Sequence, residues 1–164
     1  MIVDQFTKWL ECFPLPQQSA ELTAKQVVDG FISRFGCPLE IHTDQGKNFD
    51  GKLFHAVCEL LQVTKTRTTP YRPCSNGQVE RYNRTLLQLM RCFLKGNQTY
   101  WDEHLQQLAG AIRSTVNRST GFTPNMMMLG REVILPIDLM VKDIHEVAEE
   151  VPAEYVTRLK KTLM

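Results

Sequence analysis

The chain has 164 residues, of which 43% are hydrophobic and 23% are charged, as in an ordinary globular domain. The sequence contains neither a membrane span nor a signal peptide, so we expect an intracellular protein with no membrane partner. Five cysteines without a Cys-x-x-Cys pair, and four scattered histidines, argue against a disulfide framework and against a zinc site.

The net charge of +1 conceals two oppositely charged segments. Residues 65–95 contain seven Lys or Arg and one acid, whereas residues 132–154 contain seven acids and one base. A basic segment that also contains Tyr71 and Tyr82 suits a nucleic-acid backbone, although a solvated helix face is the simpler explanation for such a segment alone. The single acid within it, Glu80, favours the nucleic-acid hypothesis.

The chain opens with two short apolar runs, residues 1–6 and 10–15, which predict a tight β-hairpin. Apolar residues then recur at helical spacing, and we expect this helix to begin at a capping box of Thr23 with Gln26. A Gly and a following Pro should end the helix. The apolar residues after them, 38–43, predict a strand.

That strand delivers Asp44, and Gly46 should allow the sharp turn that follows. A second helix is expected from about Gly51, with Asp50 as its cap. Residues 63–68 alternate and are rich in β-branched side chains, which predicts another strand. The order of strands and helices predicts an α/β fold. The residues expected to face inward from the second helix are Leu53, Phe54, Val57, Leu60 and Leu61.

Residues 76–96 predict a long amphipathic helix with two distinct faces. Its apolar face should pack on the core and comprises Val79, Tyr82, Leu86, Leu89, Met90 and Phe93. Its polar face comprises Glu80, Arg84, Gln88, Arg91 and Lys95. Glu80 should therefore point away from the core, among cations. An ion pair with Arg84, contributing about 0.3 kcal/mol, is the simpler explanation for such a glutamate.

The rest of the chain predicts a helix capped by Thr99 and Asp102, followed by a Met-rich helix that begins after Pro124 and ends at Gly130. The residues expected to face inward from the first of these are Trp101, Leu105, Leu108, Ile112 and Val116. An extended strap and an acidic helical tail should follow. We therefore divide the chain into a core, residues 1–125, and a C-terminal extension, residues 126–164.

Six segments follow one another in the order found in a known family. They are VDQFTKW, RFGCP, IHTDQGKNF, TRTTPYRP, SNGQVERYNRTL, and a tail containing TGFTP, LGRE and LPIDL. They cover residues 1 to about 141 and resemble the integrase catalytic core of gypsy-type long-terminal-repeat retrotransposons, transposable elements of the retroviral integrase superfamily. The resemblance implies a ribonuclease H-like α/β fold, with a mixed sheet flanked by helices.

The resemblance implies DNA integration by metal-dependent phosphodiester cleavage and strand transfer. Two Mg²⁺ or Mn²⁺ ions would stabilise charge on the attacking and leaving oxygens, which is why convergent carboxylates are needed. By resemblance, Asp44 and Glu80 are the catalytic and metal-binding residues. The resemblance also implies homo-oligomers and, for a functional protein, a nuclear location. The residues implied to contact DNA are Asn76, Gln78, Arg81, Asn83 and Arg84.

In the family, VDQFTKW forms the second strand, and the first catalytic Asp lies on the central strand before it. The resemblance therefore implies a truncated relative whose central strand and first acid are missing, leaving two strand edges without partners. Asp4 is either a substitute for that acid or a hairpin residue that turns the chain at Thr7. Two hypotheses follow: a DNA-integrating polynucleotidyl transferase, active once the first acid is supplied, or an inactive remnant that binds only nucleic acid or a host partner.

Overall fold

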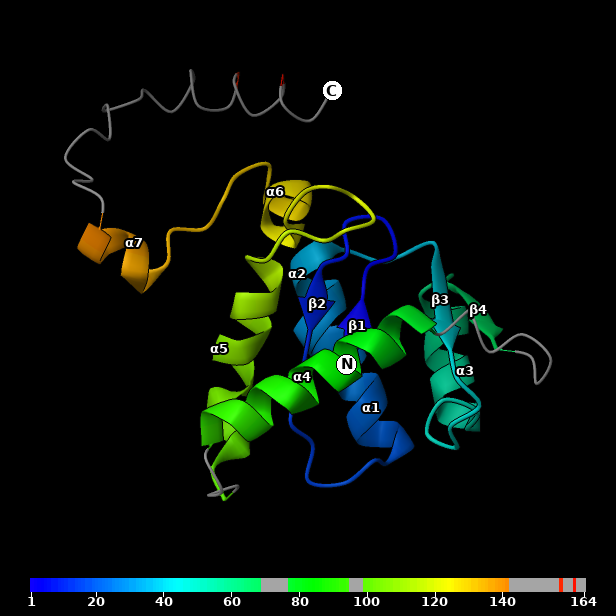
Figure 1. Ribbon diagram of the computed structural model, residues 1–164. Helices are drawn as coiled ribbons and strands as arrows, with labels where there is room; N and C mark the ends of the chain where they lie inside the picture. Colours follow the sequence, from blue (N-terminus) through cyan, green and yellow to red (C-terminus); the bar gives the residue numbers. More distant parts are fainter. Residues whose placement is uncertain (69–76, 95–98, 142–156, 158–160, 162–164) are drawn as a thin grey trace. The chain divides into compact units, whose positions relative to one another are not determined.

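The computed structural model describes residues 1–68, 77–94, 99–141, 157 and 161 (Figure 1). None of the described helices is both long and apolar enough to span a membrane. Two compact units divide the chain between them: Met1–Val3 with Glu11–Ala109, and Asp4–Leu10 with Gly110–Met164.

The first unit is built on a strand–helix–strand segment, as the sequence predicts. Strand β3 (Glu40–Thr43) leads through helix α3 (Lys52–Leu60) to strand β4 (Thr64–Arg67), which pairs with β3 in parallel. Helix α1 (Ala20–Gln26) packs against α3, and the two enclose an apolar cluster. The buried members of this cluster are Ala24, Phe54, Cys58 and Val63.

The strands form two separate pairs. Strand β1 (Ile2–Val3) pairs with β2 (Leu10–Glu11), and within the described residues this pair is not hydrogen-bonded to β3 and β4. The predicted hairpin is confirmed, although its strands are shorter than expected. Two separate pairs are compatible with the predicted absence of a strand between β1 and β3, because each pair then keeps a free edge.

The first helix begins earlier than the sequence predicts. The hydroxyl of Ser19, not that of Thr23, caps α1 by accepting the backbone N–H of Leu22 at 3.2 Å. Thr23 lies inside the helix and is buried, so the expected capping box with Gln26 is wrong. The helix continues as a π-helical segment, η1 (Val27–Ile32), and a last turn, α2 (Ser33–Phe35). It ends at Gly36, as predicted, where φ is +86°.

Helix α3 also differs from prediction at its start and on its surface. Gly51 occupies the cap position without a side-chain bond, and Asp50 forms ion pairs with Lys65 and Arg67 instead. Phe54 is buried as expected, but Leu53 is 43% exposed and Leu60 is 83% exposed. Only the face of α3 that meets α1 and the strands is covered, so the predicted inward-facing surface was too wide.

Helices α4 (Gly77–Leu94) and α5 (Trp101–Arg113) follow the predicted positions closely. Helix α4 contacts β1, and Leu86 is the buried residue of this helix. Phe93, expected in the core, is 54% exposed and contacts the ring of His104 edge-on, with 5.0 Å between ring centroids. Trp101, at the start of α5, and Val116, after its end, are also exposed, whereas both were predicted to face the core.

The second unit holds the hairpin turn and the chain after residue 109. Helix α6 (Pro124–Leu129) is capped by Thr123 and ends at Gly130 in the left-handed region, as predicted. Helix α7 (Pro136–Val141) follows it. Arg113 stacks on the ring of Trp9 and donates to the carbonyl of Leu10 at 3.0 Å. A domain boundary at residue 125 stays a prediction, and most of the acidic tail lies outside the described residues.

The buried cysteines should resist alkylation in the folded protein. Cys12 and Cys58 are buried, whereas Cys37 and Cys92 are exposed. Burial also raises the pKa of the Cys58 thiol, against the opposing effect of Lys65, so little reactive thiolate forms near neutral pH. We expect iodoacetamide to modify Cys37 and Cys92 first, as read by mass spectrometry of peptides. Equal native-state rates for Cys58 and Cys37 would contradict this burial.

Candidate active site

Asp44 directly follows β3, at the edge of the sheet where β4 also ends. The parallel register pairs Thr43 with Arg67, and the backbone N–H of Thr68 donates to the carbonyl of Thr43 at 2.9 Å. The side-chain amide of Gln45 donates to the carbonyl of Thr68 at 3.0 Å. Asp44 is therefore an exposed carboxylate on a backbone that is fixed from both strands.

Gly46 fits this turn for a reason that the sequence did not indicate. The predicted turn after Gly46 is present, with the backbone N–H groups of Phe49 and Asp50 donating to its carbonyl, although Gly46 itself does not adopt a positive φ. Instead, two side-chain oxygens lie against it. A β-carbon built on Gly46 would lie 2.7 Å from Asn48 Oδ1 and 2.9 Å from Asp44 Oδ1. The backbone N–H of Gly46 also donates to Asp44 Oδ1 at 3.0 Å, which fixes that oxygen beside the glycine.

Glu80 lies in the first turn of α4 and is exposed, as predicted. Within the described part of the chain, no ion pair joins it to Arg84, so the simpler explanation of a local pair is not observed. An acid in the first helical turn is also favourable for the helix dipole, which is a structural reason for its presence. Glu80 is therefore available to a ligand without first breaking a salt bridge.

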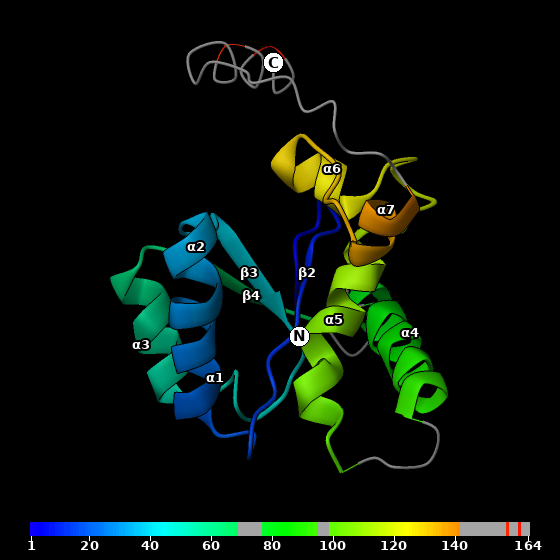
Figure 2. The ribbon, with the colours of Figure 1, turned by 90° about the vertical axis from the view of Figure 1, so that its left-hand side faces the viewer.

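The two acids belong to the same compact unit. Strand β4 ends at Arg67, beside Thr43, and α4 begins ten residues later at Gly77. Figures 1 and 2 show β3 and β4 side by side, with α3 next to them. Asp44 directly follows β3 and Glu80 lies in the first turn of α4, and a metal site shared by these two acids stays a prediction.

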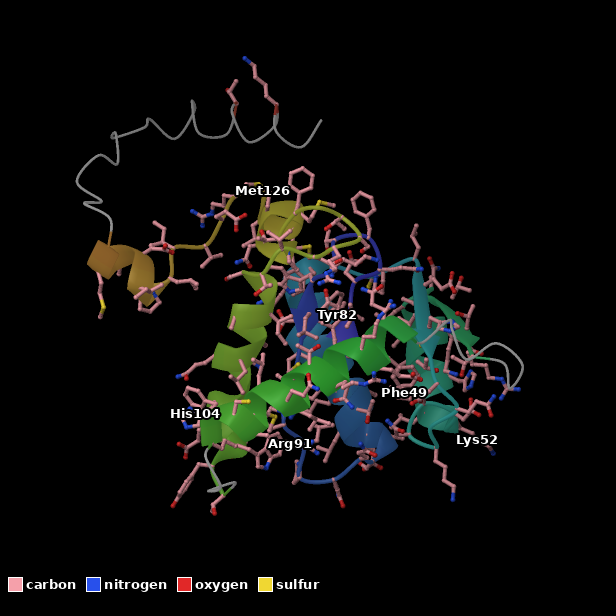
Figure 3. All side chains as sticks on the ribbon, in the orientation of Figure 1. Phe49, Lys52, Tyr82, Arg91, His104 and Met126 are labelled. Carbon is pink, nitrogen blue, oxygen red and sulfur yellow. The ribbon has the colours of Figure 1, made fainter. Side chains whose placement is uncertain are left out.

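The residues predicted to contact DNA differ in their exposure to solvent. Arg81, Asn83 and Arg84 are exposed on α4, whereas Gln78 is half-buried and Asn76 lies outside the described residues. On the predicted polar face, Gln88 and Arg91 are exposed as well, the latter labelled in Figure 3. Lys95 lies outside the described residues. The exposed residues leave a helix face with cations available to an anionic partner.

Asp4 acts within the hairpin. Its Oδ2 atom accepts the backbone N–H of Thr7 at 2.7 Å and the Thr7 hydroxyl at 2.6 Å. Its backbone N–H donates to the carbonyl of Trp9 at 2.9 Å, which closes the turn. The structure therefore gives Asp4 the role of the hairpin residue that turns the chain.

Hard oxygen donors at this loop fit a divalent cation. Asp44 offers a carboxylate, and Asn48 Oδ1 lies against the same space above Gly46. Oxygen ligands are those that Mg²⁺ prefers, and Mg²⁺ keeps several of its waters, so few protein ligands suffice. Among the described residues, no group of three or more His, Cys, Asp or Glu side chains comes together. The loop and Glu80 would therefore supply only part of a complete metal site.

Sequence reasoning missed Asn48 and Gln45. Both lie in IHTDQGKNF, the segment that carried the resemblance, so their polarity beside Asp44 was the available signal. Their partners, Thr23 and Thr68, are 25 and 23 residues away, and no local pattern identifies such pairs.

Known proteins match both the sequence and the fold of the chain. Residues 1–73 match the family described as Integrase core domain. The Gag-Pol polyprotein of avian reticuloendotheliosis virus is 33% identical over 130 residues, which are 79% of this chain and 11% of that protein. The "Retrovirus-related Pol polyprotein from transposon 412" of Drosophila melanogaster is 27% identical over 135 residues, 82% of this chain and 11% of that protein. The chain thus spans about a tenth of the length of these relatives.

Solved integrase structures share the fold. The catalytic core domain of BIV integrase aligns with a TM-score of 0.64 and 26% identity, covering 78% of this chain and 82% of that one. The catalytic core domain of HTLV-2 integrase, solved in complex with magnesium, aligns with a TM-score of 0.64 and 21% identity, covering 77% and 80%. The gypsy type and the truncation stay predictions. The predicted resemblance to the retroviral integrase superfamily is confirmed: the chain has the ribonuclease H-like fold of retroviral integrase catalytic cores, and its first 73 residues match the integrase core domain.

Proposed function

We propose that the chain is the catalytic region of a DNA integrase of the gypsy retrotransposon type, and that Asp44 and Glu80 hold its divalent metal ions. One observation supports this most directly. An exposed carboxylate directly follows β3 where β4 also ends, and an exposed glutamate, which forms no ion pair with another described residue, lies in the first turn of the helix that follows β4. The match to the integrase core domain favours this function over an inactive remnant.

In phosphodiester transfer, some residues of the chain would bind the metal ions and others would bind the DNA backbone. Bound Mg²⁺ or Mn²⁺ ions would stabilise the charge that develops on the attacking and leaving oxygens. The Gly46 N–H orients Asp44 by bonding Oδ1, which leaves Oδ2 for a ligand. Glu80 would approach from the first turn of α4, and Arg81 and Arg84 would hold the phosphate backbone without reading its sequence. Magnesium in the complex with HTLV-2 integrase supports this choice of ion.

The proposal also includes self-association, because the magnesium complex of HTLV-2 integrase is described as trimeric and another structural match is an intasome. Size-exclusion chromatography with light scattering would measure it.

The deciding experiment is a plasmid nicking and strand-transfer assay on a longer product, in which an upstream segment supplies the first acid. We expect activity with Mg²⁺ or Mn²⁺ and none after chelation with EDTA. Activity that persists in EDTA would overturn the metal-dependent mechanism. Salt-sensitive DNA binding without cleavage at any metal concentration would instead establish the remnant that binds nucleic acid alone.

Removal of the exposed α4 cations should weaken DNA binding uniformly across sequences. Arg81 and Arg84 are exposed and would each neutralise a phosphate, so each contact contributes a slope of about −0.9 to log K against log salt. We expect Arg81→Ala and Arg84→Ala each to lower affinity and to reduce the slope by about 1. Fluorescence anisotropy at several salt concentrations measures both quantities. Arg131→Ala, which removes an exposed cation outside α4, is the control and should leave the slope unchanged.

A further inference from the structure

The loop of residues 44–50 is fixed at its two ends by bonds to the strands. Gln45 bonds the carbonyl of Thr68, and Asp50 forms ion pairs with Lys65 at 3.5 Å and Arg67 at 3.2 Å. Inside the loop, the carbonyl of Gly46 accepts the backbone N–H groups of residues 49 and 50 at 2.8 and 3.1 Å. The middle of the loop, where Asn48 lies, is the part that these bonds leave unattached to the strands.

Asn48 attaches this middle part to helix α1. Its Nδ2 atom donates to the hydroxyl of Thr23 at 3.2 Å. Thr23 is only 7% exposed, and it lies on the helix that packs against α3, so the bond joins the loop to a rigid element of the core. Asn48 itself is half-buried, which protects its bond to Thr23 from competing water.

The other end of the same amide faces Asp44. With Nδ2 engaged by Thr23, Asn48 Oδ1 lies 2.7 Å from the point where a β-carbon on Gly46 would be, and Asp44 Oδ1 lies 2.9 Å from that point. Both oxygens therefore lie beside the same point next to Gly46. The Gly46 N–H fixes Asp44 Oδ1 at this point, and the bond to Thr23 fixes the amide of Asn48 beside it.

We propose that Asn48 is a positioning residue for the Asp44 carboxylate, and that the bond from Asn48 to Thr23 sets the affinity of this loop for a divalent cation. The inference rests on the proposed function, because it concerns the cation that Asp44 would hold. Groups that orient a metal ligand typically change metal affinity by about 10- to 100-fold when they are removed. Asn48 would thus act through Asp44 rather than on the substrate.

The test is a titration of the whole chain with Mn²⁺, followed by electron paramagnetic resonance, which reports cation binding without any activity. We expect Asn48→Ala to weaken binding by about tenfold or more. Thr23→Val removes the acceptor with little change of shape and should have the same effect. The double variant should be no weaker than either single variant, because both changes break one bond.

Two further variants separate positioning from folding. Gly46→Ala brings a methyl group against the side-chain oxygens of Asn48 and Asp44. Because the ends of these side chains can move, we expect an unchanged melting temperature. Because their movement displaces the Asp44 carboxylate, we expect weaker Mn²⁺ binding. Thr66→Val is the matched control: the Thr66 hydroxyl also forms side-chain hydrogen bonds, but its partners, Glu40 and His42, lie on β3 and outside the loop of residues 44–50. It should leave Mn²⁺ binding unchanged.

The outcomes distinguish this inference from the function on which it rests. Wild-type Mn²⁺ affinity in Asn48→Ala and Thr23→Val would overturn the role of Asn48 and leave the proposed integrase function standing. Absence of Mn²⁺ binding by the wild-type chain would overturn both the cation site and the inference. If Asn48→Ala fails to fold, Thr23→Val decides the question.

Discussion

Replacement of Asp44 by asparagine should abolish metal-dependent strand transfer while leaving the fold intact. The asparagine keeps an oxygen that can accept the Gly46 N–H but removes the negative charge that would hold the cation. Loss of several kcal/mol of charge stabilisation corresponds to a fall in rate of about 10³-fold or more. Rates from the strand-transfer assay, with Mg²⁺ and with Mn²⁺, measure the effect. Asp44 is exposed, so the melting temperature should not change.

Asp102→Asn is the control for this change, because it removes an exposed aspartate from the first turn of α5. It should leave the rate unchanged. Glu80→Gln should reproduce the Asp44→Asn defect, and the two changes together should be no worse than either alone, since they disable one site. Wild-type rates in either site variant would contradict the assignment of these two acids.

The elements that the sequence predicted correctly are those set by local chemistry. The alternating run before Arg67 forms β4, and the 3.6-residue spacing of apolar residues forms α4. Gly36 and Gly130 end their helices in left-handed conformations, which glycine alone adopts readily. Asp44 and Glu80 could be placed at a strand end and at a helix start because both positions follow from these local patterns.

The wrong predictions concern residues with competing partners. Asp50 was predicted to cap α3, but its carboxylate instead forms ion pairs with Lys65 and Arg67, which lie on β4. Thr23 could cap a helix, but Ser19 lies one turn earlier and does so. Such choices depend on which side chains the tertiary structure brings together, and no spacing in the sequence contains that information. The bond from Asn48 to Thr23 escaped prediction for the same reason.

Truncation of Phe54 to alanine should be the most destabilising single change in the first unit. Phe54 is 1% exposed, and its ring meets that of Phe49 edge-on, with 5.4 Å between centroids. A cavity at this position should lower the free energy of unfolding by about 3–5 kcal/mol. Chemical denaturation followed by circular dichroism measures it. The loss exceeds that of ordinary surface substitutions, which change stability by about 0.5 kcal/mol or less.

Leu60→Ala on the same helix is the matched control, because Leu60 is apolar but 83% exposed. A small effect at Leu60 with a large one at Phe54 would establish which face of α3 packs on α1. Equal losses would contradict that orientation of the helix. The orientation matters for the site as well, since α1 carries Thr23 and packs on α3. If Phe54 holds the two helices together, Phe54→Ala should also weaken Mn²⁺ binding at Asp44, by releasing the element to which Asn48 is bonded.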